Sequence, residues 1–128
     1  MTSPRRKPTD AELAILRVLW ASGPSTVRQV VDALGKDTGY TTALKLLQIM
    51  TEKRLVQRDE TLRTHVYRAA YTEDQTQRQL VGDLVDRAFG GSAAKLVLQA
   101  LNARKATPEE MAEIKRLLDR HAGKGERE

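Results

Sequence analysis

Four polar residues, Thr41, Thr42, Lys45 and Gln48, recur within one short stretch at the spacing of a helix. At about 3.6 residues per turn, Thr41, Lys45 and Gln48 fall on one face, and Thr42 lies beside them. Hydroxyl, ammonium and amide groups on one helix face can donate to phosphates and reach base edges in the major groove of DNA. The opposite face carries an apolar stripe that would pack on a core: Ala43, Leu44, Leu47 and Met50. By itself this pattern also fits an ordinary amphipathic surface helix.

The segment after this helix favours DNA binding over an ordinary surface helix. Residues 55–59 and 64–69 contain β-branched and aromatic residues with polar flanks, and a turn-like stretch, 60–63, separates them. This pattern predicts a two-stranded hairpin with a basic tip. Two shorter helical patterns precede the helix at 39–55, and the order helix, helix, helix, hairpin is that of a winged helix-turn-helix. In that fold the third helix reads a groove, and the hairpin, called the wing, contacts the backbone.

Basic residues near the predicted recognition helix are candidates to support it. Arg63 and His65 lie in the wing, where they can contact phosphates beside the groove. Arg28 lies near the start of the second helix, where a phosphate contact and simple solvent exposure are equally compatible with the sequence. The charge distribution supports a DNA partner, because residues 1–71 hold 12 Lys and Arg against 7 Asp and Glu, whereas residues 72–128 hold 10 of each. A basic solvated surface is the alternative explanation.

The composition excludes several classes of chemistry. The chain has no cysteine, so disulfides, thiolate catalysis and Cys-ligated metals are excluded. His65 and His121 are far apart and lack the spacing of a metal site, and no glycine-rich phosphate-binding motif is present. We therefore expect no catalytic residue, no metal and no cofactor. No apolar run approaches the roughly 18 residues that a membrane span needs, so we expect no membrane insertion and a cytoplasmic location.

Capping signals and glycines divide the chain into four parts. We expect a basic flexible arm at 1–8, a winged-helix domain at 9–71, a helical dimerisation domain at 72–122 and a frayed tail at 123–128. The arm is either a disordered terminus or a loose phosphate contact. Reciprocal capping pairs are predicted at Thr9 with Glu12, at Thr72 with Gln75, and at Thr107 with Glu110. The first helix should bury Leu13, Leu16, Leu19 and Trp20, and Ser25 or Thr26 should cap the second.

The helices after the wing carry more apolar surface than three short helices can bury alone. The helix around 96–101 is apolar on nearly every face, which requires partners on both sides. We expect a second copy of the chain to supply them in an intertwined homodimer, and a monomer whose C-terminal helices fold back is the alternative. The residues expected in the dimer interface are Leu80, Leu84, Phe89, Leu96, Val97, Leu101, Ile114 and Leu117.

Several motifs in this order resemble one family of bacterial transcription regulators, the BlaI/MecI/CopY or penicillinase repressor family. The resemblance covers about residues 8–121. Its motifs are TDAELAILRVLW at 9–20, GYTTAL at 39–44, EKRLV at 52–56, the segment from Gly90 to Leu98, and TPEE at 107–110. It implies a winged-helix domain, a three-helix dimerisation region, and repression by occupying a dyad operator, often with TACA/TGTA half-sites.

The resemblance also assigns residues to DNA contact. The recognition-helix positions of the family fall on Thr41, Thr42 and Lys45, with Gln48 as a weaker transfer, and its wing positions fall on Arg63 and Thr64. Tyr40 belongs to the same motif and is included among the expected DNA-binding residues.

Three departures limit what the resemblance carries over. Family members that a membrane protease controls are cut at an Asn-Phe pair, which is Gln99-Ala100 here, so cleavage is not carried over and a sensor protease stays unassigned. Copper-responsive members have a cysteine tail that this chain lacks. The usual Lys-Gly before the wing is Lys53-Arg54, so Arg54 must adopt the left-handed conformation or the helix must end differently.

Together, the residues and the resemblance predict a mainly α fold with a small β-hairpin: a winged helix-turn-helix domain followed by a three-helix dimerisation region. The predicted function is a homodimeric repressor bound to double-stranded operator DNA. The alternative is a winged-helix protein-interaction module that uses Leu46 or Ile49 as an exposed apolar anchor and does not read DNA.

Overall fold

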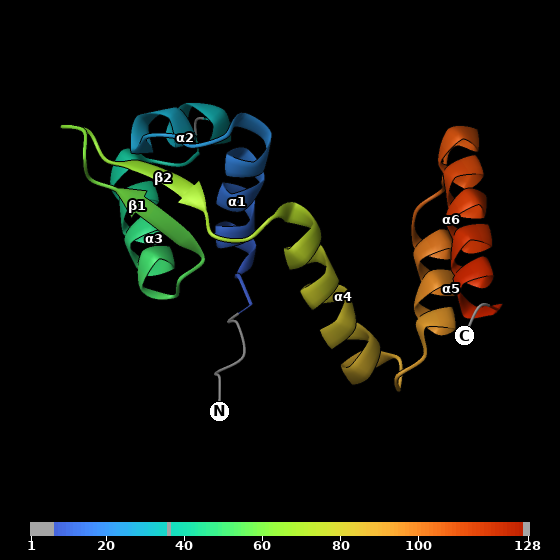
Figure 1. The fold of residues 1–128 in the computed structure, drawn as a ribbon. Coiled ribbons are helices and arrows are strands. Elements are labelled where there is room, and N and C mark those ends of the chain that lie inside the picture. Colours follow the sequence, from blue (N-terminus) through green and yellow to red (C-terminus); the bar gives the residue numbers. More distant parts are fainter. Residues whose placement is uncertain (1–6, 36, 127–128) are drawn as a thin grey trace. The chain divides into compact units, whose positions relative to one another are not determined.

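The computed structural model describes residues 7–35 and 37–126 of the chain. In these ranges it contains α1 (Asp10–Ser22), α2 (Val27–Leu34), α3 (Tyr40–Glu52), β1 (Val56–Asp59), β2 (Val66–Ala69), α4 (Glu73–Ala88), α5 (Ala93–Ala103) and α6 (Pro108–Glu126) (Figure 1). The predicted mainly α fold with a winged helix-turn-helix is confirmed. Residues 1–6 of the expected arm, Lys36 of the expected turn and residues 127–128 of the expected tail lie outside the described residues.

Side-chain caps determine where most of these helices begin. At α1, the Thr9 hydroxyl accepts from the Glu12 N–H at 3.2 Å, and the Thr9 N–H donates to Glu12 Oε1 at 2.9 Å. The same reciprocal geometry begins α2, α4 and α6, at Thr26–Gln29, Thr72–Gln75 and Thr107–Glu110. These pairs confirm the three predicted capping boxes and assign the second cap to Thr26. Helix α3 differs, because its N-cap is Gly39 and no side chain caps it.

The wing is joined to the helices through Tyr67. Strands β1 and β2 form a two-stranded antiparallel sheet in which Arg58 pairs with Tyr67. Tyr67 also pairs with Ser25 on its other side, through N–H···O bonds of 2.9 and 2.8 Å between the two backbones. Ser25 therefore extends the sheet rather than capping α2, and the hairpin is held against the corner between α1 and α2.

The core of the winged helix lies where α1, α2 and α3 meet the wing. Its least exposed large side chains come from every one of these elements: Ile15, Val30, Leu47, Met50, Val56 and Tyr67. The prediction for α1 needs a correction, because Ile15 is fully buried whereas Leu13 and Trp20 are only partly buried against the core. Trp20 keeps one edge at the surface, where its Nε1 donates to the Tyr71 carbonyl at 3.0 Å.

Helix α3 ends in a Schellman motif without glycine. The Leu55 N–H donates to the Met50 carbonyl at 2.9 Å, and the Arg54 N–H donates to the Thr51 carbonyl at 3.1 Å. Arg54 has a φ of 65°, the one non-glycine residue with positive φ among those that the structure describes. Arg54 therefore adopts the left-handed conformation, and Met50 before it and Leu55 after it are both buried in the core.

A buried carboxylate joins the start of α1 to the end of α3. Both oxygens of Glu12 lie 2.9 Å from Lys53 Nζ, and the Glu12 side chain is 2% exposed while that of Lys53 is 21% exposed. Glu12 was predicted only as a helix cap. Glu12 also accepts from Lys53 at the end of α3, so this pair relates the two helices to each other.

The chain divides into two compact units, residues 1–82 and 83–128, called here the winged-helix unit and the C-terminal unit. The winged-helix unit includes the first part of α4, which the sequence analysis assigned to the dimerisation region, and Thr76 of α4 is buried. In the C-terminal unit α5 has no buried residue. Helix α6 continues to Glu126, so residues 123–126 are helical and not part of a frayed tail as expected. No helix in the described part of the chain is long and apolar enough to cross a membrane.

Replacing Lys53 should destabilise the protein more than replacing Glu12. Lys53→Met leaves a buried carboxylate without its counter-charge, which costs about 3 kcal/mol. Glu12→Gln keeps an acceptor for the Thr9 N–H and leaves Lys53 in partial contact with water, which costs about 1–2 kcal/mol. Denaturant unfolding at neutral pH measures both values. The double variant should recover part of the loss, and strictly additive losses would contradict a coupled pair.

Titration supplies the control for this comparison. Burial by itself raises the pKa of Glu12, but hydrogen bonds from Thr9 and Lys53 and the charge of Lys53 outweigh it, so the pKa lies below its ordinary value of 4.5. A lowered carboxyl pKa contributes stability above the unfolded pKa, and this stability is lost as pH falls through the folded pKa. The free energy of unfolding should therefore fall more steeply for the wild type than for Glu12→Gln as pH drops below 4.5.

Candidate nucleic-acid interface

The four polar residues predicted to read DNA lie together on the exposed side of α3. Thr41, Thr42, Lys45 and Gln48 are all exposed, and none of their side chains has a hydrogen bond or ion pair to another described residue. The other side of α3 is buried at Ala43, Leu47 and Met50. The core therefore fixes which side of the helix faces outward, and the polar face of α3, meaning these four residues, is free to bind a partner.

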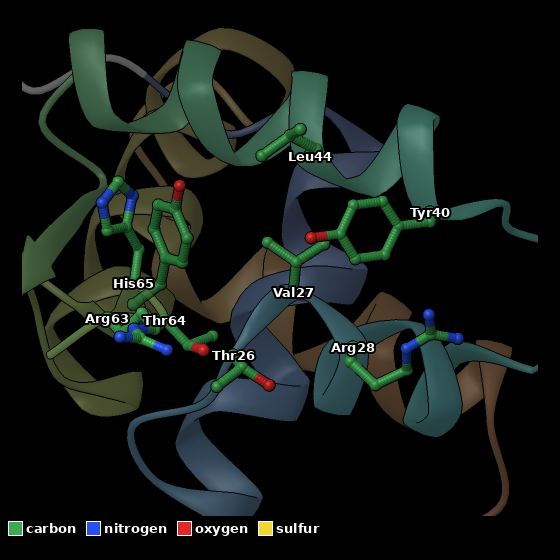
Figure 2. A pocket seen from close by; sticks show the side chains of 9 residues that line it. Thr26, Val27, Arg28, Tyr40, Leu44, Arg63, Thr64 and His65 are labelled. Atoms are coloured by element: carbon green, nitrogen blue, oxygen red, sulfur yellow. The ribbon is translucent and has the colours of Figure 1, made fainter. Parts of the chain in front are cut away.

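Beside the polar face, a hollow of about 320 Å³ lies between the starts of α2 and α3 and the wing loop, residues 60–65. Figure 2 shows Arg28 and Tyr40 on one side of it and Arg63, Thr64 and His65 on the other. These five residues were all predicted to bind DNA, and the structure gathers them around one depression. The remaining lining residues are Thr26, Val27, Leu44 and Tyr67.

The two helices that border the hollow are linked by an Arg–Tyr contact. The Arg28 guanidinium carbon lies 5.5 Å from the centre of the Tyr40 ring, within the range of a cation–π interaction. Tyr40 is the first residue of α3 and is 46% exposed. The contact holds a positive charge next to the start of α3, where the first N–H groups have no side-chain cap. Backbone N–H groups and a nearby cation both favour an anionic oxygen.

The acidic residues of the wing are held by partners within the wing itself. Asp59 accepts from the Thr61 N–H at 2.9 Å and from its hydroxyl at 2.7 Å, and these bonds hold the pKa of Asp59 below its ordinary value. Glu60 forms an ion pair with Arg58. Arg63, in contrast, has no partner among the residues that the structure describes. The positive charge that the wing offers to an external anion is therefore on the side that borders the hollow.

Sequence reasoning did not place four of the lining residues at this site: Thr26 and Val27 at the start of α2, Leu44 and Tyr67. Leu44 and Tyr67 were recognised only as apolar or aromatic residues of the helix and the hairpin, and Thr26 only as a candidate cap. In residues 7–35 and 37–126, no group of three or more His, Cys, Asp or Glu side chains could hold a metal ion.

The predicted dimer residues lie in α4, α5 and α6 and in the link after α4. Four of the eight are more than a third exposed: Leu84 at 48%, Val97 at 43%, Leu101 at 37% and Leu117 at 40%. The other four, Leu80, Phe89, Leu96 and Ile114, are partly buried.

Comparison with known proteins gives a family match over most of the chain. Residues 8–120 match the model of the family described as penicillinase repressor. Two relatives named transcriptional regulator BlaI, from Mycobacterium tuberculosis strains CDC 1551 and H37Rv, are each 31% identical over 121 residues, covering 92% of this chain and 88% of the relative.

A solved structure of Bordetella bronchiseptica BpsR, from work on the regulation of its DNA binding by 6-hydroxynicotinic acid, covers 94% of this chain and 78% of that one. Its TM-score is 0.46 and its identity 22%. A likeness at this level carries no argument about function.

Removing a positive charge from either side of the hollow should weaken binding to double-stranded DNA similarly for all sequences. Arg28→Ala and Arg63→Ala should each reduce the slope of log K against log salt by about 1, because each removes one phosphate contact. Fluorescence anisotropy at several salt concentrations measures this slope. Arg68→Ala is the matched control, since Arg68 donates to Gln57 and does not line the hollow. An equal change of slope in all three variants would contradict a specific role of the hollow.

Proposed function

Because the chain belongs to the penicillinase repressor family, a family of DNA-binding transcriptional repressors, we propose that it acts as a homodimer on a two-fold symmetric operator. In this proposal it blocks transcription by occupying double-stranded promoter DNA in a sequence-specific way. The partner is the operator, and the proposal includes no catalytic step and no cofactor. A repressor of bacterial promoters works where the chromosome is, so we place the protein in the cytoplasm.

One observation carries the proposal: the polar face of α3 is exposed and unpaired beside a hollow with basic side chains on both sides. A helix that presents Thr41, Lys45 and Gln48 in the major groove can reach base edges with hydroxyl, ammonium and amide groups. We assign Thr42 to the same surface. The residues that border the hollow, Arg28, Tyr40, Arg63, Thr64 and His65, would then contact the phosphates next to the groove and set the register.

The proposed homodimer rests on apolar surface in the C-terminal unit. Helix α5 has no buried residue although it carries Leu96, Val97, Leu98 and Leu101. A second copy would cover these side chains at about 25 cal/mol for each Å² removed from water. Two-fold symmetry would also present two α3 helices to two half-sites, about one helical turn or a multiple of it apart.

The alternative of a protein-interaction module finds less support in α3. It requires an exposed apolar anchor at Leu46 or Ile49, but both side chains are partly buried and Leu46 packs against the core. The polar face of α3 has no large apolar side chain to replace them. A DNA ligand is also distinguishable by experiment, because release of counterions makes its affinity fall steeply with salt.

The first test is selection of bound genomic fragments with the purified full-length protein at two salt concentrations, followed by affinity measurements on the selected site. Lys45→Ala should lower the affinity for that site by roughly 1–3 kcal/mol if Lys45 contacts a base, and should relax the preference at one position of each half-site. Lys45→Arg, which keeps the charge, is the control. Failure to enrich any symmetric site with a folded protein would refute the proposed function.

A charge introduced on the apolar side of α5 should dissociate the dimer. Val97→Asp would place a carboxylate in the covered interface, so we expect a monomer in sedimentation velocity and a roughly tenfold or greater loss of affinity for a symmetric site. Gln99→Asp, which puts the same charge at an exposed polar position of α5, is the matched control. A Val97→Asp variant that still sediments as a dimer would argue against this interface.

A further inference from the structure

The wing loop carries an exposed leucine, Leu62. Leu62 is 63% exposed, more than any other large hydrophobic side chain in the described part of the chain. Loop tips normally carry polar or small residues, since an apolar tip gains nothing from water. A single exposed leucine needs no explanation by its exposure alone. The position of Leu62 within the loop is what gives it meaning.

The two sides of the wing loop differ in how they are bound. On the side before Leu62, Asp59 accepts hydrogen bonds from Thr61, and Glu60 forms an ion pair with Arg58. Both carboxylates are therefore bound within the wing. On the side after Leu62, residues 63–65 line the hollow beside the start of α3. Leu62 therefore lies between the side of the loop whose carboxylates are bound within the wing and the side that borders the proposed phosphate contacts.

We propose that Leu62 enters the DNA minor groove next to each half-site, while Arg63 stays on a phosphate at the edge of that groove. This inference rests on the proposed function, in which α3 occupies the major groove and the wing crosses the adjacent backbone. The minor groove is about 6 Å wide, enough for one leucine side chain between the sugar walls. Apolar side chains are used in this way by proteins that contact the minor groove.

The chemistry of the loop favours this occupant over another protein. An apolar protein contact would need neighbouring apolar side chains, but the residues adjacent to Leu62 are Thr61 and Arg63. Arg63 has no partner among the described residues, so a polyanion is the complementary surface next to the leucine. The deoxyribose walls of the minor groove offer apolar C–H surface to Leu62, next to the phosphates that Arg63 can contact.

The proposal predicts a sequence preference outside the half-sites that is read from the minor groove. The amino group of guanine projects into that groove and would collide with Leu62. An inosine·cytosine pair lacks this amino group but presents the same major-groove pattern as G·C, so it changes only what is read from the minor groove. Full-length wild-type protein should bind the selected operator with A·T or I·C flanks about equally, and roughly tenfold more weakly with G·C flanks.

Two substitutions at Leu62 test the residue itself. Leu62→Ser should abolish most of the flank preference and lower the affinity for the A·T-flanked operator by roughly tenfold, while Leu62→Met, which keeps an apolar side chain, should retain both. Because Leu62 is exposed, neither variant should change the melting temperature or the sedimentation of the free protein. A change in sedimentation would instead make Leu62 a self-association residue and overturn the proposal.

The outcomes separate this inference from the proposed function. If the wild type binds no symmetric site, the proposed function fails. If the wild type binds its operator but Leu62→Ser keeps the wild-type affinity and flank preference, only the role of Leu62 is refuted. If operators with I·C flanks bind as weakly as those with G·C flanks, the preference is read from the major groove, and the minor-groove placement is wrong.

Discussion

The carboxylate of Glu12 is bonded on two sides inside the winged-helix unit, and the placement of α3 depends on it. It accepts from the Thr9 N–H at the start of α1 and from Lys53 at the end of α3. A buried carboxylate without partners is costly, so packings of α1 against α3 that separate these groups are strongly disfavoured. In the described part of the chain no buried side-chain nitrogen or oxygen lacks a partner. The interior thus fixes one arrangement of the helices.

The outer surface of α3 differs from the interior, where every buried polar side-chain atom of the described residues has a partner. Its polar face and the basic side chains at the hollow are largely without internal partners, and their positions come from the buried residues behind them. Tyr67 has a part in both regions, because it is 1% exposed, pairs with Ser25 through the backbone and also lines the hollow. This pairing brings the wing to the corner between α1 and α2. A rigid interior therefore presents unsatisfied groups in a defined geometry, which favours specific binding over loose electrostatic attraction.

The two units bury their apolar side chains to different degrees. In the winged-helix unit, residues from three helices and both strands enclose one core. In the C-terminal unit, leucines and valines of α5 and α6 stay exposed, with Leu98 at 55% and Leu118 at 59%. Helical periodicity in the sequence identifies apolar residues but does not say what covers them. Within this family of repressors, an uncovered surface of this kind is the physical reason to expect that a second chain completes the fold.

The sequence by itself determined the helix starts and the two faces of α3. Capping pairs such as Thr9–Glu12 and Thr107–Glu110 and the spacing of Thr41, Lys45 and Gln48 involve residues three or four positions apart, and local geometry is enough to relate them.

Only the tertiary structure decided which distant residues meet. The pairing of Glu12 with Lys53 and of Ser25 with Tyr67, and the gathering of Arg28 with Arg63 around one hollow, join residues more than thirty positions apart. The same holds for the burial of Ile15 in place of Leu13, because both are apolar and nearly adjacent. Such choices depend on the packing of the whole core, since each contact forms only when several helices have already taken their places.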